Sequence, residues 1–215
     1  VLDSKQLRLP ISDFDETIRE CLVNCLAHAD YIQGYPTTKI DVYDGWFCFL
    51  NPGKMLVSTQ QFLLGGDSRP RNEIIMKLFR LLGASERQGF GGPLIFKTAI
   101  ENAFRRPEIV TDIEKTELKI WNIDLADSYS DLNLETKDVL RYIVKNNSPQ
   151  SVNDIRKALD MTEYKVRKSI QELESNQLIS KMGNGPSTKY YPKLESVEAL
   201  TKLQIAMDQL KKRMI

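Results

Sequence analysis

The sequence predicts an α+β protein of two domains, with helices on one face of a sheet in the first and three helices before a β-ribbon in the second. Three observations lead to this prediction. Apolar residues recur at helical spacing in several segments, short alternating runs flank tight turns, and the charge changes sign along the chain. We place the domains at residues 1–126 and 127–215, because the polar segment 124–131 lacks periodicity.

The composition is that of a globular protein, since 41% of the 215 residues are hydrophobic and 27% are charged. No apolar run approaches the roughly 18 residues of a membrane span, and no basic-then-apolar stretch opens the chain. We therefore expect a cytoplasmic protein that does not enter a membrane. The first residue is Val rather than Met, so we expect a piece of a longer protein.

The three cysteines form neither a CxxC motif nor a cluster with the single histidine. Cys21 and Cys25 lie on the apolar side of an expected helix, and Cys48 lies in an expected strand. A zinc site needs such a cluster, so we expect buried, reduced thiols.

The charge is distributed unevenly. Residues 1–132 carry 15 Lys and Arg against 19 Asp and Glu, for a net charge of −4. Residues 133–215 carry 15 against 10, for a net charge of +5. A basic module behind an acidic one predicts that the second half binds a polyanion.

An amphipathic helix is expected over residues 16–32. Its apolar residues share one side, while Glu20, Asn24 and His28 follow each other at intervals of four on the other side. On spacing alone, this stripe is a solvated face. Its carboxylate, amide and imidazole groups could instead line a site.

The remaining elements of the first domain form a sheet and further helices. Two strands flank the turn Asp44-Gly45, and a long loop follows them. Helices covering one face of an antiparallel or mixed sheet fit this order. In order, we expect strands at 39–43 and 46–50, a loop at 51–72, a helix at 74–82, a Gly-rich turn at 89–93, a helix at 94–104 and a strand at 116–123.

The second half predicts three helices followed by a two-stranded ribbon. Ser151 caps the second helix, and Thr162 is the candidate N-cap of the third. The turn Gly183-Asn184-Gly185-Pro186 joins the two strands. The expected helices span about 134–145, 152–159 and 163–175, and the strands span 178–182 and 188–191.

This order resembles a winged helix-turn-helix over residues 134–192. The resemblance implies that the start of the third helix enters the major groove of double-stranded DNA while the hairpin follows the backbone. Winged helices also serve as protein-docking modules, and that alternative stays open. Phosphate contacts would come from Lys165, Arg167, Lys168, Lys181 and Lys189, and base contacts from Thr162, Glu163 and Tyr164.

A last helix is expected from about residue 194 to 214. Its apolar residues Leu200, Leu203, Met207, Leu210 and Met214 are spaced 3, 4, 3, 4 over two heptads. This seam predicts either a homodimer contact or packing of the helix against its own domain.

Four motifs in the first domain together resemble the RecG-like family of transcriptional regulators. They are the run at 19–31 (RECLVNCLAHADY), Asn51-Pro52-Gly53, the run at 65–72 (GGDSRPRN) and the run at 88–92 (QGFGG). The similarity covers residues 8–122 and implies an ATP-binding domain similar to the GHKL fold of gyrase and histidine kinases. The chain has no GxxxxGK[ST] phosphate loop, so a helicase motor is not implied.

The resemblance also implies roles for residues of a site for ATP and Mg²⁺. Glu20 would activate water, Asn24 would be a metal ligand, and His28 would meet a phosphate. Asn51 stands where the family has an Asp that accepts the adenine amine. The remaining members would be Gly53 beside the base, Gly89, Gly91 and Gly92 as a phosphate turn, and Arg69 and Arg71 as a lid reaching the γ-phosphate.

Two main functions follow from these observations. The first is a DNA-binding transcriptional regulator whose front domain is a nucleotide sensor or a dimerisation unit. The second is a GHKL-type ATPase whose winged helix is an adaptor. A scaffold with two protein-docking modules is a third interpretation, so whether the chain is an enzyme is left open.

Overall fold

The structure is a computed structural model that describes residues 12–66, 69–84, 89–146 and 148–193, together with residues 199, 201, 203 and 207. The described chain divides into two compact units. Of the described residues, unit 1 holds those at 12–101 and 106–122 with Thr201, Leu203 and Met207, and unit 2 holds those at 102–105 and 123–193 with Ala199. Helices and antiparallel strands occur in both units, which confirms the predicted α+β class.

Unit 1 is built on a four-stranded sheet in the order β1-β2-β4-β3. All of its pairings are antiparallel, so among the described residues the sheet is antiparallel rather than mixed. The turn Asp44-Gly45 joins the first two strands, as predicted, with Gly45 at a φ of 83°. The strands are β1 (Lys39–Tyr43), β2 (Trp46–Pro52), β3 (Glu108–Thr111) and β4 (Lys115–Trp121).

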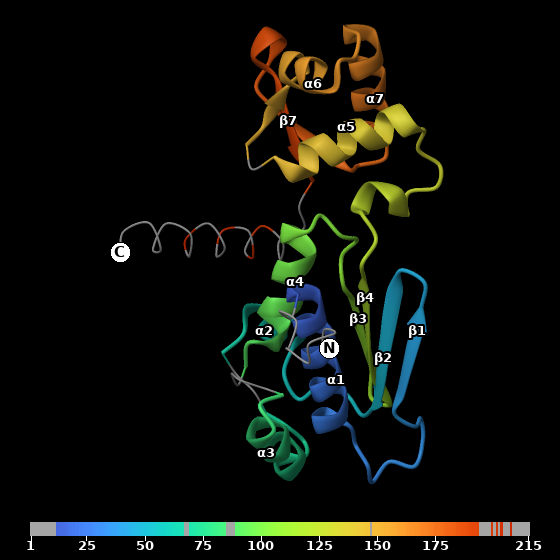
Figure 1. The fold of residues 1–215 in the computed structure, drawn as a ribbon, viewed down its shortest axis with the longest axis vertical. Helices are drawn as coiled ribbons and strands as arrows, with labels where there is room; N and C mark the ends of the chain where they lie inside the picture. The colour runs from blue at the N-terminus through green and yellow to red at the C-terminus, as the bar shows by residue number, and fades with distance from the viewer. Residues whose placement is uncertain are drawn as a thin grey trace, which may run out of the picture. The chain divides into compact units, whose positions relative to one another are not determined.

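The helices of unit 1 lie on one side of this sheet (Figure 1). Helix α1 packs against α3, α4 and β2. Ser12 begins α1 with a capping box, because its hydroxyl accepts from the Asp15 amide while the Asp15 carboxylate accepts from the Ser12 amide. The helices are α1 (Asp13–His28), α2 (Thr59–Leu64), α3 (Glu73–Leu81) and α4 (Gly91–Glu101).

Two short elements of unit 1 were not predicted from the sequence. Helix α2 lies within the expected loop 51–72, and its signal was the capping box formed by Ser58 and Gln61. Strand β3 has only four residues. In addition, α4 begins at Gly91, so the glycine-rich turn runs directly into the first turn of a helix.

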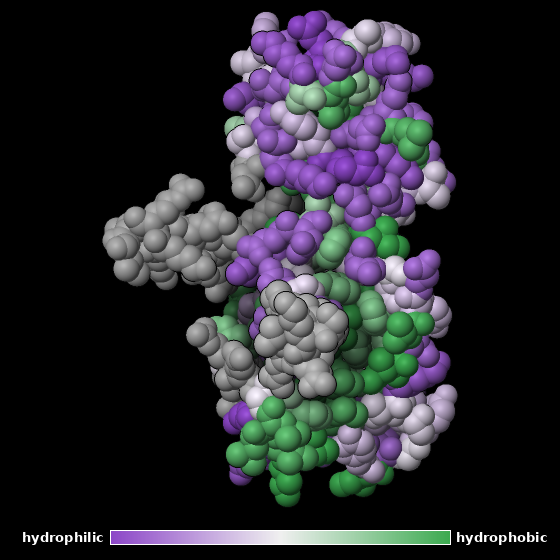
Figure 2. Space-filling model, viewed as in Figure 1, coloured by the Kyte–Doolittle hydropathy of each residue, from purple (hydrophilic) through white to green (hydrophobic). Residues whose placement is uncertain are grey.

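One face of α3 presents apolar side chains to solvent. Ile74, Leu78, Leu81 and Leu82 are all more than half exposed. Figure 2 shows hydrophobic residues gathered over this helix, whereas hydrophilic residues predominate on the visible face of unit 2.

Unit 2 contains three helices and a three-stranded antiparallel sheet in the order β5-β7-β6. Its core lies between the helices and includes Val139, Ile155, Val166 and Leu173, all fully buried. The elements are α5 (Leu134–Lys145), β5 (Gln150–Ser151), α6 (Val152–Leu159), α7 (Glu163–Ser175), β6 (Ile179–Met182) and β7 (Lys189–Pro192). Ser151 and Thr162 cap α6 and α7, at the positions expected from the sequence.

The segment 124–131, expected to be a linker, lies inside unit 2. Residues Leu125–Ser128 form a short 3-10 helix, capped by the Asp124 side chain. The Arg141 guanidinium lies 3.3 Å from an Asp124 oxygen and 2.8 Å from an Asp127 oxygen. These ion pairs attach the segment to α5.

Most of the helix expected at 194–214 lies outside the described residues. Of its predicted seam, Leu203 and Met207 are described, and both are helical and exposed. Leu200, Leu210 and Met214 lie outside the described part. Within the described part of the chain, no helix has the length and apolar character that crossing a bilayer requires.

Candidate functional site

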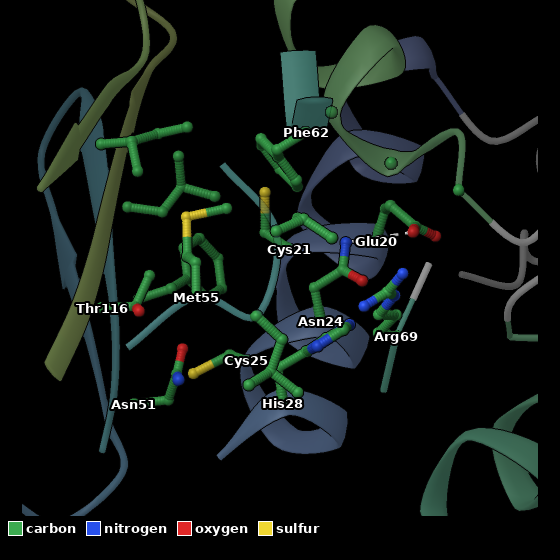
Figure 3. A pocket seen from close by; sticks show the side chains of 18 of the residues that line it. Glu20, Cys21, Asn24, Cys25, His28, Asn51, Met55, Phe62, Arg69 and Thr116 are labelled. Carbon is green, nitrogen blue, oxygen red and sulfur yellow. Dashed lines mark hydrogen bonds between the residues drawn. The ribbon is translucent and has the colours of Figure 1, made fainter. Parts of the chain in front are cut away.

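A pocket in unit 1 lies between the inner face of the sheet and helices α1 and α4. It brings together eight of the ten predicted nucleotide-site residues (Figure 3). The stripe on α1 therefore lines a cavity, although its spacing alone favoured a solvated face. The eight residues are Glu20, Asn24, His28, Asn51, Arg69, Gly89, Gly91 and Gly92.

Glu20 and Asn24 are joined at one side of the pocket. Asn24 Nδ2 donates a hydrogen bond of 3.1 Å to Glu20 Oε1. The first turn of α4 covers this pair closely, because a Cβ at Gly91 would lie 2.5 Å from Glu20 Oε1 and 2.6 Å from Asn24 Nδ2. A side chain at position 91 would therefore displace the Glu20–Asn24 pair.

Burial changes the acid–base properties of two groups on the α1 stripe. Burial raises the pKa of Glu20, against the opposing effects of the Asn24 hydrogen bond and the Arg19 charge. Burial also lowers the pKa of His28, and the nearby Arg71 charge adds to this shift. His28 is therefore neutral at physiological pH, and Glu20 holds a proton more tightly than an exposed glutamate does.

The opposite side of the pocket is formed by the sheet. Asn51 on β2 pairs directly with Thr116 on β4, so both side chains project from the same face. Figure 3 shows them across the pocket from Glu20 and Arg69. Most of the remaining lining is apolar and comes from Cys21, Cys25, Phe49, Met55, Leu56, Val57, Phe62, Met76, Ile109 and Leu118.

Two basic side chains also line the pocket. Arg69 lies beside Asn24 in Figure 3, and Lys54 follows the end of β2. Together with the amide groups at the start of α4, they provide positive potential for an anionic ligand.

Arg71 and Gly53, two predicted site residues, are not among the lining residues. The Arg71 guanidinium pairs with Asp30 at 3.2 Å and donates to the carbonyl oxygens of His28 and Lys54 at 3.2 and 2.9 Å. Gly53 donates its amide to the Glu114 carbonyl. Arg71 thus holds the end of α1 to the loop after β2.

The residues present fit a nucleotide with Mg²⁺. Since Nδ2 of Asn24 is bonded to Glu20, its Oδ1 is the atom that can bind a hard cation. Among the described residues, no group of three or more His, Cys, Asp and Glu side chains forms a metal site of its own. A magnesium ion here would therefore depend on phosphate oxygens for most of its ligands.

The cysteines are buried free thiols, as expected. Burial raises the pKa of the Cys25 thiol to about 12, so this side chain is not a nucleophile at neutral pH. Cys21 and Cys25 contribute apolar surface to the pocket.

Sequence reasoning missed several residues of the pocket. Thr116 had a usable signal, because it alternates with Leu118 and Ile120 along a predicted strand and therefore faces inward with them. Lys54, Met55 and Phe62 fell in an expected loop, where periodicity placed none of them. The capping box of Ser58 and Gln61 was a usable signal for α2, which carries Phe62.

In unit 2, the predicted DNA-contacting residues all have exposed side chains, and six of them lie at the start of α7 or at its N-cap. Several cations have acidic partners. Lys165 pairs with Glu135, and Arg167 Nη2 lies 2.7 Å from Glu163 Oε1. Lys181 Nζ lies 3.7 Å from Glu174.

One family model matches the chain. Residues 37–120 match the model described as "Putative ATP-dependent DNA helicase recG C-terminal". The match supports a RecG-like, ATPase-like domain in unit 1. Its range includes the sheet, α2, α3 and α4, and begins after α1, which carries Glu20, Asn24 and His28.

Two solved structures resemble parts of the chain. The DIP2311 protein from Corynebacterium diphtheriae is 16% identical with a TM-score of 0.45, and the match covers 94% of this chain. The present chain spans only 43% of the length of that protein. MepR of S. aureus bound to ethidium bromide is 22% identical with a TM-score of 0.28, over 41% of this chain and 69% of that one. No curated protein matches the chain.

Proposed function

We propose that the protein is a DNA-binding transcriptional regulator in which unit 1 binds a purine nucleotide as a regulatory ligand. The observation that carries this proposal is the pocket of unit 1. Eight residues that the sequence motifs single out, from four separate segments, line one cavity with an apolar centre. Such a cavity with a few convergent polar groups is the usual form of a small-molecule site.

The polar groups divide into two sets that suit the two ends of a nucleotide. Arg69, Lys54 and the first turn of α4 attract phosphate groups, and Asn24 Oδ1 is the candidate magnesium ligand. Asn51 and Thr116 across the pocket suit the polar edge of a base. The apolar lining between them is suited to a flat ring.

Unit 2 supports the DNA-binding part of the proposal. Its order of three helices and an antiparallel ribbon is that of a winged helix-turn-helix. Helix α7 begins with exposed residues and carries Lys168, which is exposed. The positive charge of residues 133–215 attracts a phosphate backbone.

Titration calorimetry of the chain with Mg-ATP and with Mg-GTP tests the nucleotide part. Binding of either nucleotide supports the proposal, and we expect Arg69→Ala to weaken it. The matched variant Arg80→Ala, an exposed position on α3, should bind like the original protein. Absence of binding heat for both nucleotides at millimolar concentration would falsify the nucleotide part.

Fluorescence anisotropy on duplex DNA at two salt concentrations tests the DNA part. Binding through phosphate contacts must weaken as salt rises, because bound counterions are released. No binding at low salt, or affinity that salt does not change, would leave unit 2 as a protein-docking module.

A second candidate function is hydrolysis of the nucleotide. The raised pKa of Glu20 favours it, because a buried carboxylate beside the candidate metal ligand can accept the proton of a water molecule. Phosphate release should then be lost in Glu20→Ala while nucleotide binding is kept. Turnover that survives in this variant would remove Glu20 as the base.

The seam of the C-terminal helix supports a homodimer, since Leu203 and Met207 are exposed apolar residues on it. A dimer would present two α7 helices to two half-sites. Light scattering of Leu203→Lys should show dissociation into monomers. A parent protein that is already monomeric at micromolar concentration would contradict the dimer.

A further inference from the structure

Helix α7 carries one large side chain at the centre of its exposed face. Its opposite face packs into the core of unit 2 through the buried residues Val166, Ile170 and Leu173. At about 100° per residue, Tyr164 lies almost opposite these three residues around the helix. Tyr164 is 75% exposed. Its side chain therefore projects away from the core of unit 2.

Cations lie on both sides of Tyr164. Arg167 and Lys168 follow it by three and four residues, so they lie one turn further along α7, to either side of it. Both are exposed, although Arg167 is paired with Glu163. Contacts of these cations with two phosphate backbones would place the exposed face of α7 in the groove between them, with Tyr164 at its centre.

The other two residues predicted to contact bases lie at the edge of this face. Thr162 is the N-cap of α7, and its hydroxyl oxygen accepts from the Lys165 amide at 3.4 Å. Glu163 lies about 100° around the helix from Tyr164, and its Oε1 accepts from Arg167 Nε at 2.8 Å. Both side chains keep some capacity for hydrogen bonds, but of the three residues only Tyr164 lies at the centre.

The major groove offers an aromatic ring one apolar partner. Every base pair presents hydrogen-bond donors or acceptors there, and thymine adds an apolar group, its C5-methyl. Contact between that methyl group and a ring removes apolar surface of both from water, which is favourable. The Tyr164 hydroxyl has no hydrogen-bond partner in the described part of the chain, so it can bond to water or to a neighbouring base edge while the ring covers the methyl group.

We propose that Tyr164 recognises thymine through its C5-methyl group in the major groove of DNA. The inference rests on the proposed binding of DNA by unit 2. The methyl contact discriminates between pyrimidines, because cytosine carries only a hydrogen at the same ring position. The phosphate contacts of Arg167 and Lys168 add affinity for every sequence.

Deoxyuridine differs from thymidine only by the missing methyl group, so it tests the contact without knowledge of the binding sequence. Two pools of random-sequence duplexes, one made with thymidine and one with deoxyuridine, compete for the full chain in anisotropy titrations at low salt. We expect the thymidine pool to bind about threefold to fourfold more tightly for one buried methyl group. A third pool, with 5-methylcytosine in place of cytosine, should bind more tightly than the thymidine pool.

Three variants assign the preference to the ring. Tyr164→Ala removes the ring, so it should bind the thymidine and deoxyuridine pools equally. Tyr164→Phe loses only the hydroxyl, so it should keep the preference for thymidine. Tyr35→Ala, the same change at an exposed tyrosine of unit 1, should also keep it. Because Tyr164 is exposed, its substitution should leave the fold of unit 2 intact.

The outcomes separate this inference from the proposed function. Equal binding of the thymidine and deoxyuridine pools by the unmodified protein overturns the methyl contact and leaves DNA binding in place. A preference that persists in Tyr164→Ala, or that is lost in Tyr164→Phe, overturns the role of the Tyr164 ring. No binding of any pool at low salt overturns both this inference and the DNA-binding part of the proposed function.

Discussion

Asn24 and Glu20 are joined by a hydrogen bond of 3.1 Å along one turn of α1, and the backbone of Gly91 lies directly against both side chains. The positions of the Glu20 and Asn24 side chains in the pocket therefore depend on how closely α4 packs against α1. Three properties meet at this point: a carboxylate with a raised pKa, a candidate metal ligand and the amide groups at the start of a helix.

Glu20→Gln should stabilise the protein at neutral pH and have little effect in acid. Because burial raises the pKa of Glu20, the folded state holds the proton more tightly than the unfolded chain does. Ionised Glu20 therefore costs stability above its folded pKa, and this cost disappears as the pH falls below the ordinary value of 4.5. Glutamine keeps the oxygen that accepts from Asn24. Thermal melts across this pH range measure the difference, and a constant difference would contradict the assigned cause.

Gly92→Ala should destabilise unit 1 strongly. A Cβ at this position would lie 1.9 Å from the carbonyl oxygen of Phe62 in α2, so the two helices must move apart. Overpacking of this kind costs about 1–3 kcal/mol, and more where backbone must shift. Gly34→Ala is the matched control, because nothing lies within 4 Å of its Cβ. Denaturant unfolding compares the two variants, and equal midpoints would show that α2 and α4 are not packed this closely.

Arg71→Ala and Arg69→Ala should separate stability from ligand binding. Arg71 holds Asp30 and two backbone carbonyl groups, so its loss should lower the free energy of unfolding by about 1–3 kcal/mol. Arg69 is an exposed lining residue, and its loss should leave the unfolding midpoint unchanged while nucleotide binding weakens. If Arg71→Ala instead weakens nucleotide binding and leaves the unfolding midpoint unchanged, Arg71 is the phosphate contact that the family resemblance implies.

The sequence predicted the α+β class and most helices, because periodic apolar residues and capping residues are local signals. Ser151 and Thr162 are examples, since each caps the helix that it was expected to begin. Helix α2 was missed, because six residues give too little periodicity.

The pocket shows a similar division between local and tertiary information. Spacing by four placed Glu20, Asn24 and His28 on one face of α1, but only the packing of α4 turns that face into a lining. The contacts of Arg71 could not be predicted from its motif. Its partners are Asp30 and backbone carbonyls of segments distant in the sequence, and no local pattern encodes such contacts.

Lys168→Ala should weaken DNA binding about equally for every sequence and reduce the salt dependence by about one phosphate contact. Lys168 is exposed on α7. Lys165 is paired with Glu135, so Glu135→Gln should strengthen binding by releasing a cation and removing an anion. Lys77→Ala, the same change at an exposed position in unit 1, is the control. Anisotropy titrations at several salt concentrations give the slope of log affinity against log salt for each variant. If Lys168→Ala keeps the salt slope of the original protein and Glu135→Gln keeps its DNA affinity, the DNA-binding surface does not include the start of α7.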